Sequence, residues 1–103
     1  MALQIMNTVL ELVREMRPTL AAVAKHDADL ARQMRRGLTS IPLNIAEGEG
    51  RKNGHGRQRF ETAMGSTNEV SACLRTADAL GYVEADARPV SYTHLTLPTK
   101  RIV

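Results

Sequence analysis

Apolar side chains recur every three or four residues in three successive segments of the chain, the spacing of an amphipathic helix. The first segment runs from Leu3 to Leu20, and Pro18 is expected to end or kink it because proline lacks the N–H that closes the preceding turn. Its apolar stripe is wide, and this width predicts burial on two sides. The wider stripe includes Ile5, Val9, Leu12 and Met16.

The second segment follows Asp27, which is a predicted N-cap, with Asp29 placed favourably near the positive end of the helix. Pro42 lies inside this segment, so we expect a kink there, relieved by the hydroxyls of Thr39 and Ser40. Leu43 points away from the apolar face, either as ordinary surface or as a subunit contact. The apolar face itself comprises Leu30, Met34, Leu38, Ile41 and Ile45.

Glycines and basic residues separate the second segment from the third. Gly48 and Gly50 are expected to end the second helix, and residues 50–59 to form a flexible basic connector. The third helix would then begin near Arg59. Its predicted apolar face comprises Phe60, Ala63, Met64, Val70, Leu74 and Ala77, and its small residues Gly65, Ser66 and Ala72 would permit close helix approach.

Two features mark where the native helical part ends. Leu80-Gly81-Tyr82 is typical of a Schellman ending, with Gly81 in the left-handed conformation. Residues 89–103 have no helical period, and codons GTC-TCT-TAT-ACA-CAT-CTG for residues 90–95 would resemble the transposon-end adapter of sequencing libraries. We therefore predict a helical domain at residues 1–88, cut off before a further helix, followed by a non-native tail at 89–103.

Composition agrees with an all-α domain and excludes several classes. Ala and Leu dominate, and aromatic residues make up only 3% of the 103 residues, which disfavours a β-sandwich or barrel. A single cysteine and the lack of a membrane span or basic leader predict a soluble, cytoplasmic protein. The formal charge is +3, but two of the 14 basic residues lie in the tail, so residues 1–88 carry 12 basic against 11 acidic side chains, a charge of +1.

The prediction of nucleic-acid binding therefore depends on two local clusters of positive charge. Such clusters bind phosphate backbones by releasing counterions. The alternatives are a solvated helix face for the first cluster, and for the second a complement to the negative end of the preceding helix. The candidate nucleic-acid-binding residues are Arg32, Arg35 and Arg36, then Arg51, Lys52, Arg57 and Arg59.

No catalytic or metal site can be assembled from the sequence. An enzyme acting through Glu47 and His55 would lack an orienting group, so we predict that the chain is not an enzyme. His26 and His55 are isolated, Cys73 is interpreted as a small core residue, and no metal or other cofactor is expected. Gly48-Glu-Gly50 does not match a dinucleotide-binding loop.

Polar residues of the second and third helices suggest a structural role. Asn44, Glu47 and Arg51 lie on one side of the second helix, and the third offers Glu61 and Glu69. These groups would either satisfy the carbonyl that Pro42 leaves without a donor or cross-link the two helices.

A set of residues spread over roughly positions 28–83 forms a recognisable pattern. Its members are Ser40, Ile41, Pro42, Asn44, Ile45, Ala46, Glu47, Gly48, Gly50, Arg51, Arg59, Phe60, Gly65, Ser66, Glu69, Leu80, Gly81 and Tyr82. In these residues the chain resembles the family of 23S ribosomal RNA intervening-sequence proteins, which includes the accessory variability determinants of diversity-generating retroelements.

The resemblance implies a bacterial up-down four-helix bundle that assembles into a homopentamer, of which about three helices are present here. It also implies nucleic-acid binding through basic surface and partnership with a reverse transcriptase. We therefore expect a non-enzymatic homo-oligomeric bundle that binds RNA or DNA weakly and without sequence choice. The alternative is a protein-interaction adaptor for a reverse transcriptase or another ribonucleoprotein. Without the fourth helix, an apolar groove would make the chain poorly soluble or prone to helix swapping.

Overall fold

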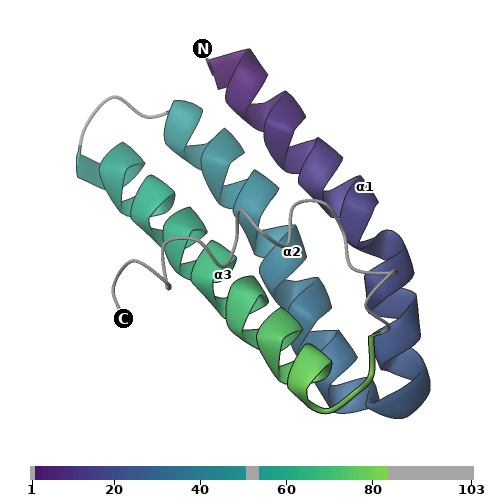
Figure 1. The fold of residues 1–103 in the computed structure, drawn as a ribbon. Coiled ribbons are helices and arrows are strands. Elements are labelled where there is room, and N and C mark those ends of the chain that lie inside the picture. Colours follow the sequence, from purple (N-terminus) through teal and green to yellow (C-terminus); the bar gives the residue numbers. More distant parts are fainter. Residues whose placement is uncertain (1, 51–53, 84–103) are drawn as a thin grey trace.

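Three antiparallel helices make up the described part of the chain. The computed structural model describes residues 2–50 and 54–83, with α1 at Ala2–His26, α2 at Ala28–Glu49 and α3 at Gly54–Ala79. The chain runs down α1, up α2 and down α3, and α2 lies between the other two helices (Figure 1). The predicted all-α fold is confirmed. The boundary at residue 88 and the tail lie outside the described residues and stay predictions.

Both internal prolines lie within continuous helices. Of the two effects predicted for Pro18, an end or a kink of the first helix, the end is wrong, because α1 continues to His26. The residues after Pro18 supply the reason, since Thr19 and Val23 are 1% and 0% exposed and their packing favours the extra helical turns. Pro42 likewise lies inside α2, which ends at Glu49. There the Thr39 hydroxyl donates to the Arg35 carbonyl at 2.8 Å, as expected near the proline.

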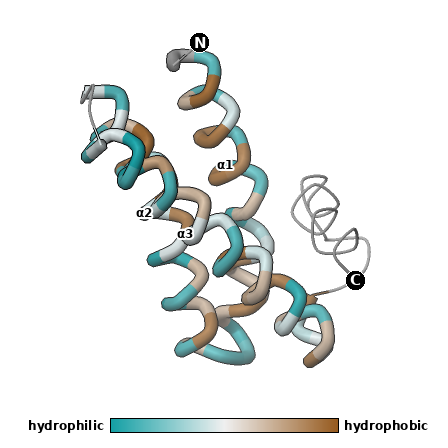
Figure 2. The backbone as a smooth tube through the Cα atoms, turned by 90° about the vertical axis from the view of Figure 1, so that its left-hand side faces the viewer, coloured by the Kyte–Doolittle hydropathy of each residue, from teal (hydrophilic) through white to brown (hydrophobic). Residues whose placement is uncertain are grey.

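The core is built from one apolar face of each helix. Figure 2 shows the apolar positions recurring along the three helices between hydrophilic ones. The predicted face of α3 needs one correction, because Phe60 is 39% exposed and Met64 is 68% exposed. The core residues of the described chain are Met16, Val23, Ala31, Met34, Leu38, Ile41, Ile45, Ala63, Val70, Cys73, Leu74, Ala77 and Val83.

Two buried glycines of α2 bring α3 close. A Cβ built on Gly37 would lie 2.7 Å from Val70 Cγ2, and one on Gly48 would lie 3.1 Å from the carbonyl oxygen of Gly56. The sequence predicted that Gly48 ends the second helix. This prediction is wrong, because Gly48 lies within α2 and packs against α3. Gly65, predicted to be a point of close approach, is exposed and has open space around it.

The connection between α2 and α3 is shorter than predicted. Gly50 caps α2 in an ordinary right-handed conformation, with its N–H bonded to the carbonyls of Glu47 and Gly48. The next helix begins at Gly54, so residues 54–59, expected in a flexible connector, are helical. Packing explains the difference, because buried Gly56 lies against Gly48 and extends the α2–α3 contact into this segment. Of the small residues predicted to sit in the contact, Ala72 is exposed and Ser66 does face α2.

The ends of three helices meet around Asp27. Its carboxylate accepts the Leu30 backbone N–H at 3.0 Å, which confirms the predicted N-cap. Gly81 has a φ of +79°, and the N–H groups of Gly81 and Tyr82 donate to the carbonyls of Asp78 and Ala77, so the Schellman ending is confirmed. This turn places the Tyr82 hydroxyl 3.4 Å from the other Asp27 oxygen.

Asp27→Ala is expected to lower the free energy of unfolding by about 1–2 kcal/mol, since it removes the cap of α2 and the acceptor of Tyr82. Urea unfolding followed by circular dichroism measures the change. Asp27→Asn is the matched control, because its side-chain oxygen still caps the helix and should recover most of the loss. A full loss in both variants would contradict the capping role.

Candidate nucleic-acid interface

The outer face of α2 presents three exposed arginines, Arg32, Arg35 and Arg36. Arg32 forms an ion pair with Asp29 at 2.6 Å, so part of its charge is already compensated. Arg35 and Arg36 have no ion pair with any residue that the structure describes. Within this first predicted cluster, the charges of Arg35 and Arg36 are therefore not compensated by a described carboxylate.

Helix α1 adds two arginines that sequence reasoning missed. Arg14, Arg17 and Arg35 line one open hollow of about 650 Å³. The single-residue turn at Asp27 folds α1 back along α2 and brings these residues together, although they are far apart in sequence. Arg14 is partly neutralised by Glu11 at 3.0 Å. The sequence signal that could have predicted their position is the one-residue connection at Asp27, which fixes how α1 and α2 align as antiparallel helices.

The structure describes only two residues of the second predicted cluster. Arg51 and Lys52 lie outside the described residues. Arg57 and Arg59 belong to α3, where residues two apart point to different sides of the helix. Arg59 faces α2 and its guanidinium donates to Asn44 Oδ1 at 3.5 Å, which places it beside the α2 arginines. We call Arg14, Arg17, Arg35, Arg36 and Arg59 the arginine surface.

Hydrogen bonds between small polar side chains join α2 to α3 next to this surface. The Asn44 amide donates to the Ser40 carbonyl at 2.8 Å and to the Ser40 hydroxyl at 2.9 Å, and the Ser66 hydroxyl lies 2.8 Å from that of Ser40. The two Asn44–Ser40 bonds lie within α2, whereas the bond that Asn44 Oδ1 accepts from Arg59 links α2 to α3, as the cross-linking role predicted. The Asn44 amide bonds the Ser40 carbonyl, whereas Pro42 leaves the Leu38 carbonyl without its usual donor.

The acidic members of the predicted structural motif lie at separate points. Glu47 and Glu61 are exposed on α2 and α3. Glu69 is also exposed, and its carboxylate reaches toward α2. A Cβ built on Gly37 would lie 3.5 Å from Glu69 Oε1. Of the three carboxylates, that of Glu69 lies at the α2–α3 contact.

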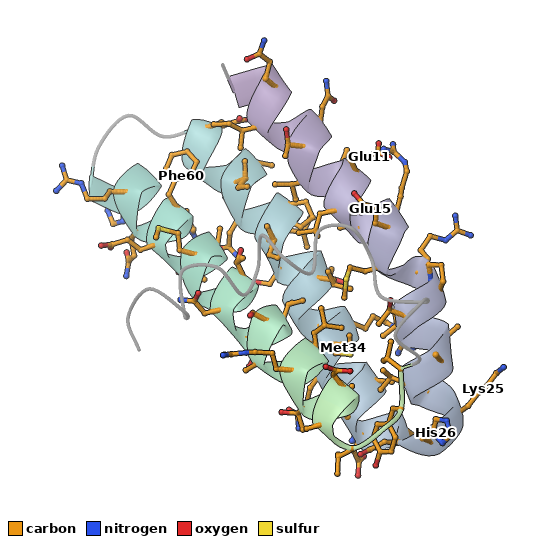
Figure 3. All side chains as sticks on the ribbon, in the orientation of Figure 1. Glu11, Glu15, Lys25, His26, Met34 and Phe60 are labelled. Carbon is orange, nitrogen blue, oxygen red and sulfur yellow. The ribbon has the colours of Figure 1, made fainter. Side chains whose placement is uncertain are left out.

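His26 and Cys73 lie apart from the arginine surface, whereas His55 lies one turn before Arg59 in α3. His26 stacks on the Tyr82 ring with centroids 5.1 Å apart at the end of the bundle, where Figure 3 labels it. His55 is exposed in the first turn of α3. Cys73 is a buried free thiol, and burial, with a smaller contribution from Glu69, raises its pKa. Its place in the core cluster confirms its interpretation as a core residue, and the raised pKa disfavours the reactive thiolate.

Within residues 2–50 and 54–83, no three His, Cys, Asp or Glu side chains gather closely enough to hold a metal ion. In the same part of the chain, no helix combines the length and apolar character needed to cross a membrane. The described aromatic rings also lie elsewhere, since Phe60 packs against Gly48 and Tyr82 against His26. The arginine surface itself presents guanidinium groups from all three helices.

Comparison with known proteins identifies the family. Neither the curated proteins nor the solved structures include a significant match to the chain. A family model, described as 23S rRNA-intervening sequence protein, matches residues 1–96. That match covers most of the chain and includes the motif residues on α2 and α3 described above. The chain belongs to the family of 23S rRNA-intervening sequence proteins.

Proposed function

We propose that the protein is a non-enzymatic, homo-oligomeric helical bundle that binds RNA or DNA weakly and without sequence choice. The observation that carries this proposal is the arginine surface, on which Arg17, Arg35 and Arg36 have no ion pair with a described carboxylate. Guanidinium groups in that state are available to phosphates, and they contact the backbone without reading bases.

Repetition of the surface in an oligomer would strengthen weak contacts. One protomer contributes at most a few phosphate contacts, and each adds only modestly to affinity. A ring of identical subunits repeats the same surface at fixed spacing, so that a long nucleic acid engages several protomers at once. Arg32 and Arg57 would contribute less, because Asp29 pairs with the first and the second points to another side of α3 than Arg59.

Salt dependence tests the proposal. In filter binding with an RNA of arbitrary sequence, the association constant should fall steeply from low to high salt, because each phosphate contact releases condensed counterions. Binding that stays unchanged across the salt series would contradict it. A partner recovered from native lysate after nuclease treatment would favour the alternative, an adaptor for a reverse transcriptase or another ribonucleoprotein.

A further inference from the structure

A groove with an aliphatic floor and arginines at its rim runs between α1 and α2. One part, of about 270 Å³, is lined by Leu10, Val13 and Pro42 among others. The larger part, of about 650 Å³, is lined by Pro18, Ala21 and Ala24 among others. Arg17, Leu20 and Arg35 line both parts, so the two parts form one continuous groove.

The floor of this groove is incompletely covered. Leu10, Val13 and Leu20 are only partly buried, although they lie on the apolar stripe of α1. The stripe is wider than α2 alone can cover, as its sequence already indicated. A ligand that brings apolar side chains into the groove would remove this surface from water, which is favourable.

The rim selects the charge of the ligand. Arg17 and Arg35 have exposed guanidinium groups and no ion pair with a described carboxylate, whereas Arg14 is paired with Glu11. A nucleic acid would supply negative charge, but its phosphates and sugars would leave the aliphatic floor uncovered. A helix with apolar residues on one face and carboxylates beside them would cover the aliphatic floor and also pair with the arginines of the rim.

We propose that the α1–α2 groove binds an acidic amphipathic helix of a partner protein. Apolar side chains of that helix, spaced at i, i+3 or i+4, and i+7, lie over Leu10, Val13 and Leu20, and its flanking carboxylates pair with Arg17 and Arg35. This interaction goes beyond the proposed nucleic-acid binding, in which Arg17 and Arg35 also take part and to which Arg36 and Arg59 add charges outside the groove.

The probe is a synthetic, fluorescently labelled helical peptide of about 18 residues, or five turns, with Leu on one face and Glu beside it. Fluorescence anisotropy measures its binding, and a scrambled peptide of the same composition lacks the apolar face. We expect the amphipathic peptide to bind at least about tenfold more tightly than the scrambled one. Equal affinity for the two peptides would overturn the proposal, since it would show a charge effect alone.

A charge swap tests the rim. Arg17→Glu/Arg35→Glu should weaken binding of the Glu peptide by about tenfold or more and should bind a matching Lys peptide instead. Lys25→Glu/Arg75→Glu, with the same net charge, is the matched control and should retain the Glu peptide. All four positions are exposed, and circular dichroism confirms that the variants fold. Failure of the Lys peptide to rescue the groove variant contradicts the proposal.

Other occupants give distinct results. If Arg17→Glu/Arg35→Glu turns an oligomer into monomers in light scattering, a second copy of the chain occupies the groove and the proposal is wrong. If Arg17→Gln/Arg35→Gln reduces RNA binding more than Arg36→Gln/Arg59→Gln does, and RNA displaces the peptide, nucleic acid is the occupant and the proposal is again wrong. If the unmodified chain does not bind RNA, the proposed function is contradicted, but peptide binding to the groove is still supported by its own measurements.

Discussion

Gly37→Leu lowers the free energy of unfolding by about 3 kcal/mol or more, because it inserts a side chain where α2 and α3 touch. Even the first added carbon would lie 2.7 Å from Val70 Cγ2 and 3.5 Å from the Ser66 carbonyl oxygen. Val70 cannot turn aside easily, since a β-branched side chain in a helix has one preferred rotamer. The helices must therefore separate, which also breaks contacts along the rest of their interface.

Gly65→Leu is the matched control for this prediction. Gly65 lies in the same pair of helices, is exposed, and has nothing within 4 Å of an added Cβ. Leucine has the better helix propensity, so this variant should gain stability by up to about 1 kcal/mol. Urea unfolding of both variants by circular dichroism separates the cases, and similar effects at the two positions would disprove the close approach at Gly37.

Leu74→Ala should cost about 3 kcal/mol of unfolding free energy, within the usual range for removing a buried leucine. Leu74 is 0% exposed and belongs to the core to which all three helices contribute. The loss combines the apolar surface that is no longer buried with the cavity left behind. In a bundle this small, such a loss is a large part of the total stability.

Leu43→Ala provides the same chemical change on the surface. Leu43 is 60% exposed on the outer face of α2, so its truncation should alter the unfolding free energy by less than about 0.5 kcal/mol. Thermal or urea unfolding of the two alanine variants compares them directly. A loss at Leu43 as large as that at Leu74 would show that its side chain is buried in an intermolecular contact.

Local signals explain why much of the fold could be predicted. The helical period places the core residues of α2, and Asp27 and Gly81 mark helix ends through hydrogen bonds within a few residues. The Schellman turn at Gly81 needs only the local backbone conformation, which glycine permits. Such features depend on neighbours in sequence, and the structure confirms them.

Features that depend on distant segments were missed or misplaced. Pro18 does not end α1, because packing of the residues beyond it outweighs one missing hydrogen bond. Gly48 is typical of a helix end by sequence, yet it lies inside α2, where Gly56 of α3 approaches. Likewise Met64 follows the apolar period of α3 but remains exposed, since no described helix covers that side.

The arginine surface likewise could be predicted only where its residues are neighbours in sequence. Arg35 and Arg36 are neighbours in sequence, so their cluster was visible there. Arg17 joins them only through the antiparallel register of α1 and α2, and Arg59 only through its contact with Asn44. Arg57 and Arg59 were grouped as one patch, whereas a helix directs them to different sides.

The salt dependence of RNA binding, compared between two double variants, tests the central claim most directly. Arg36→Gln/Arg59→Gln removes two charges from the arginine surface, and Lys25→Gln/Arg75→Gln removes two exposed charges away from it, Lys25 projecting outward from the end of α1 (Figure 3). The slope of log K against log salt should become shallower by about 1.4–1.8 in the first variant, with affinity about 10- to 100-fold lower at 0.1 M salt. The second variant should keep nearly the slope of the unmodified chain. Equal slopes in both variants would contradict binding through the arginine surface.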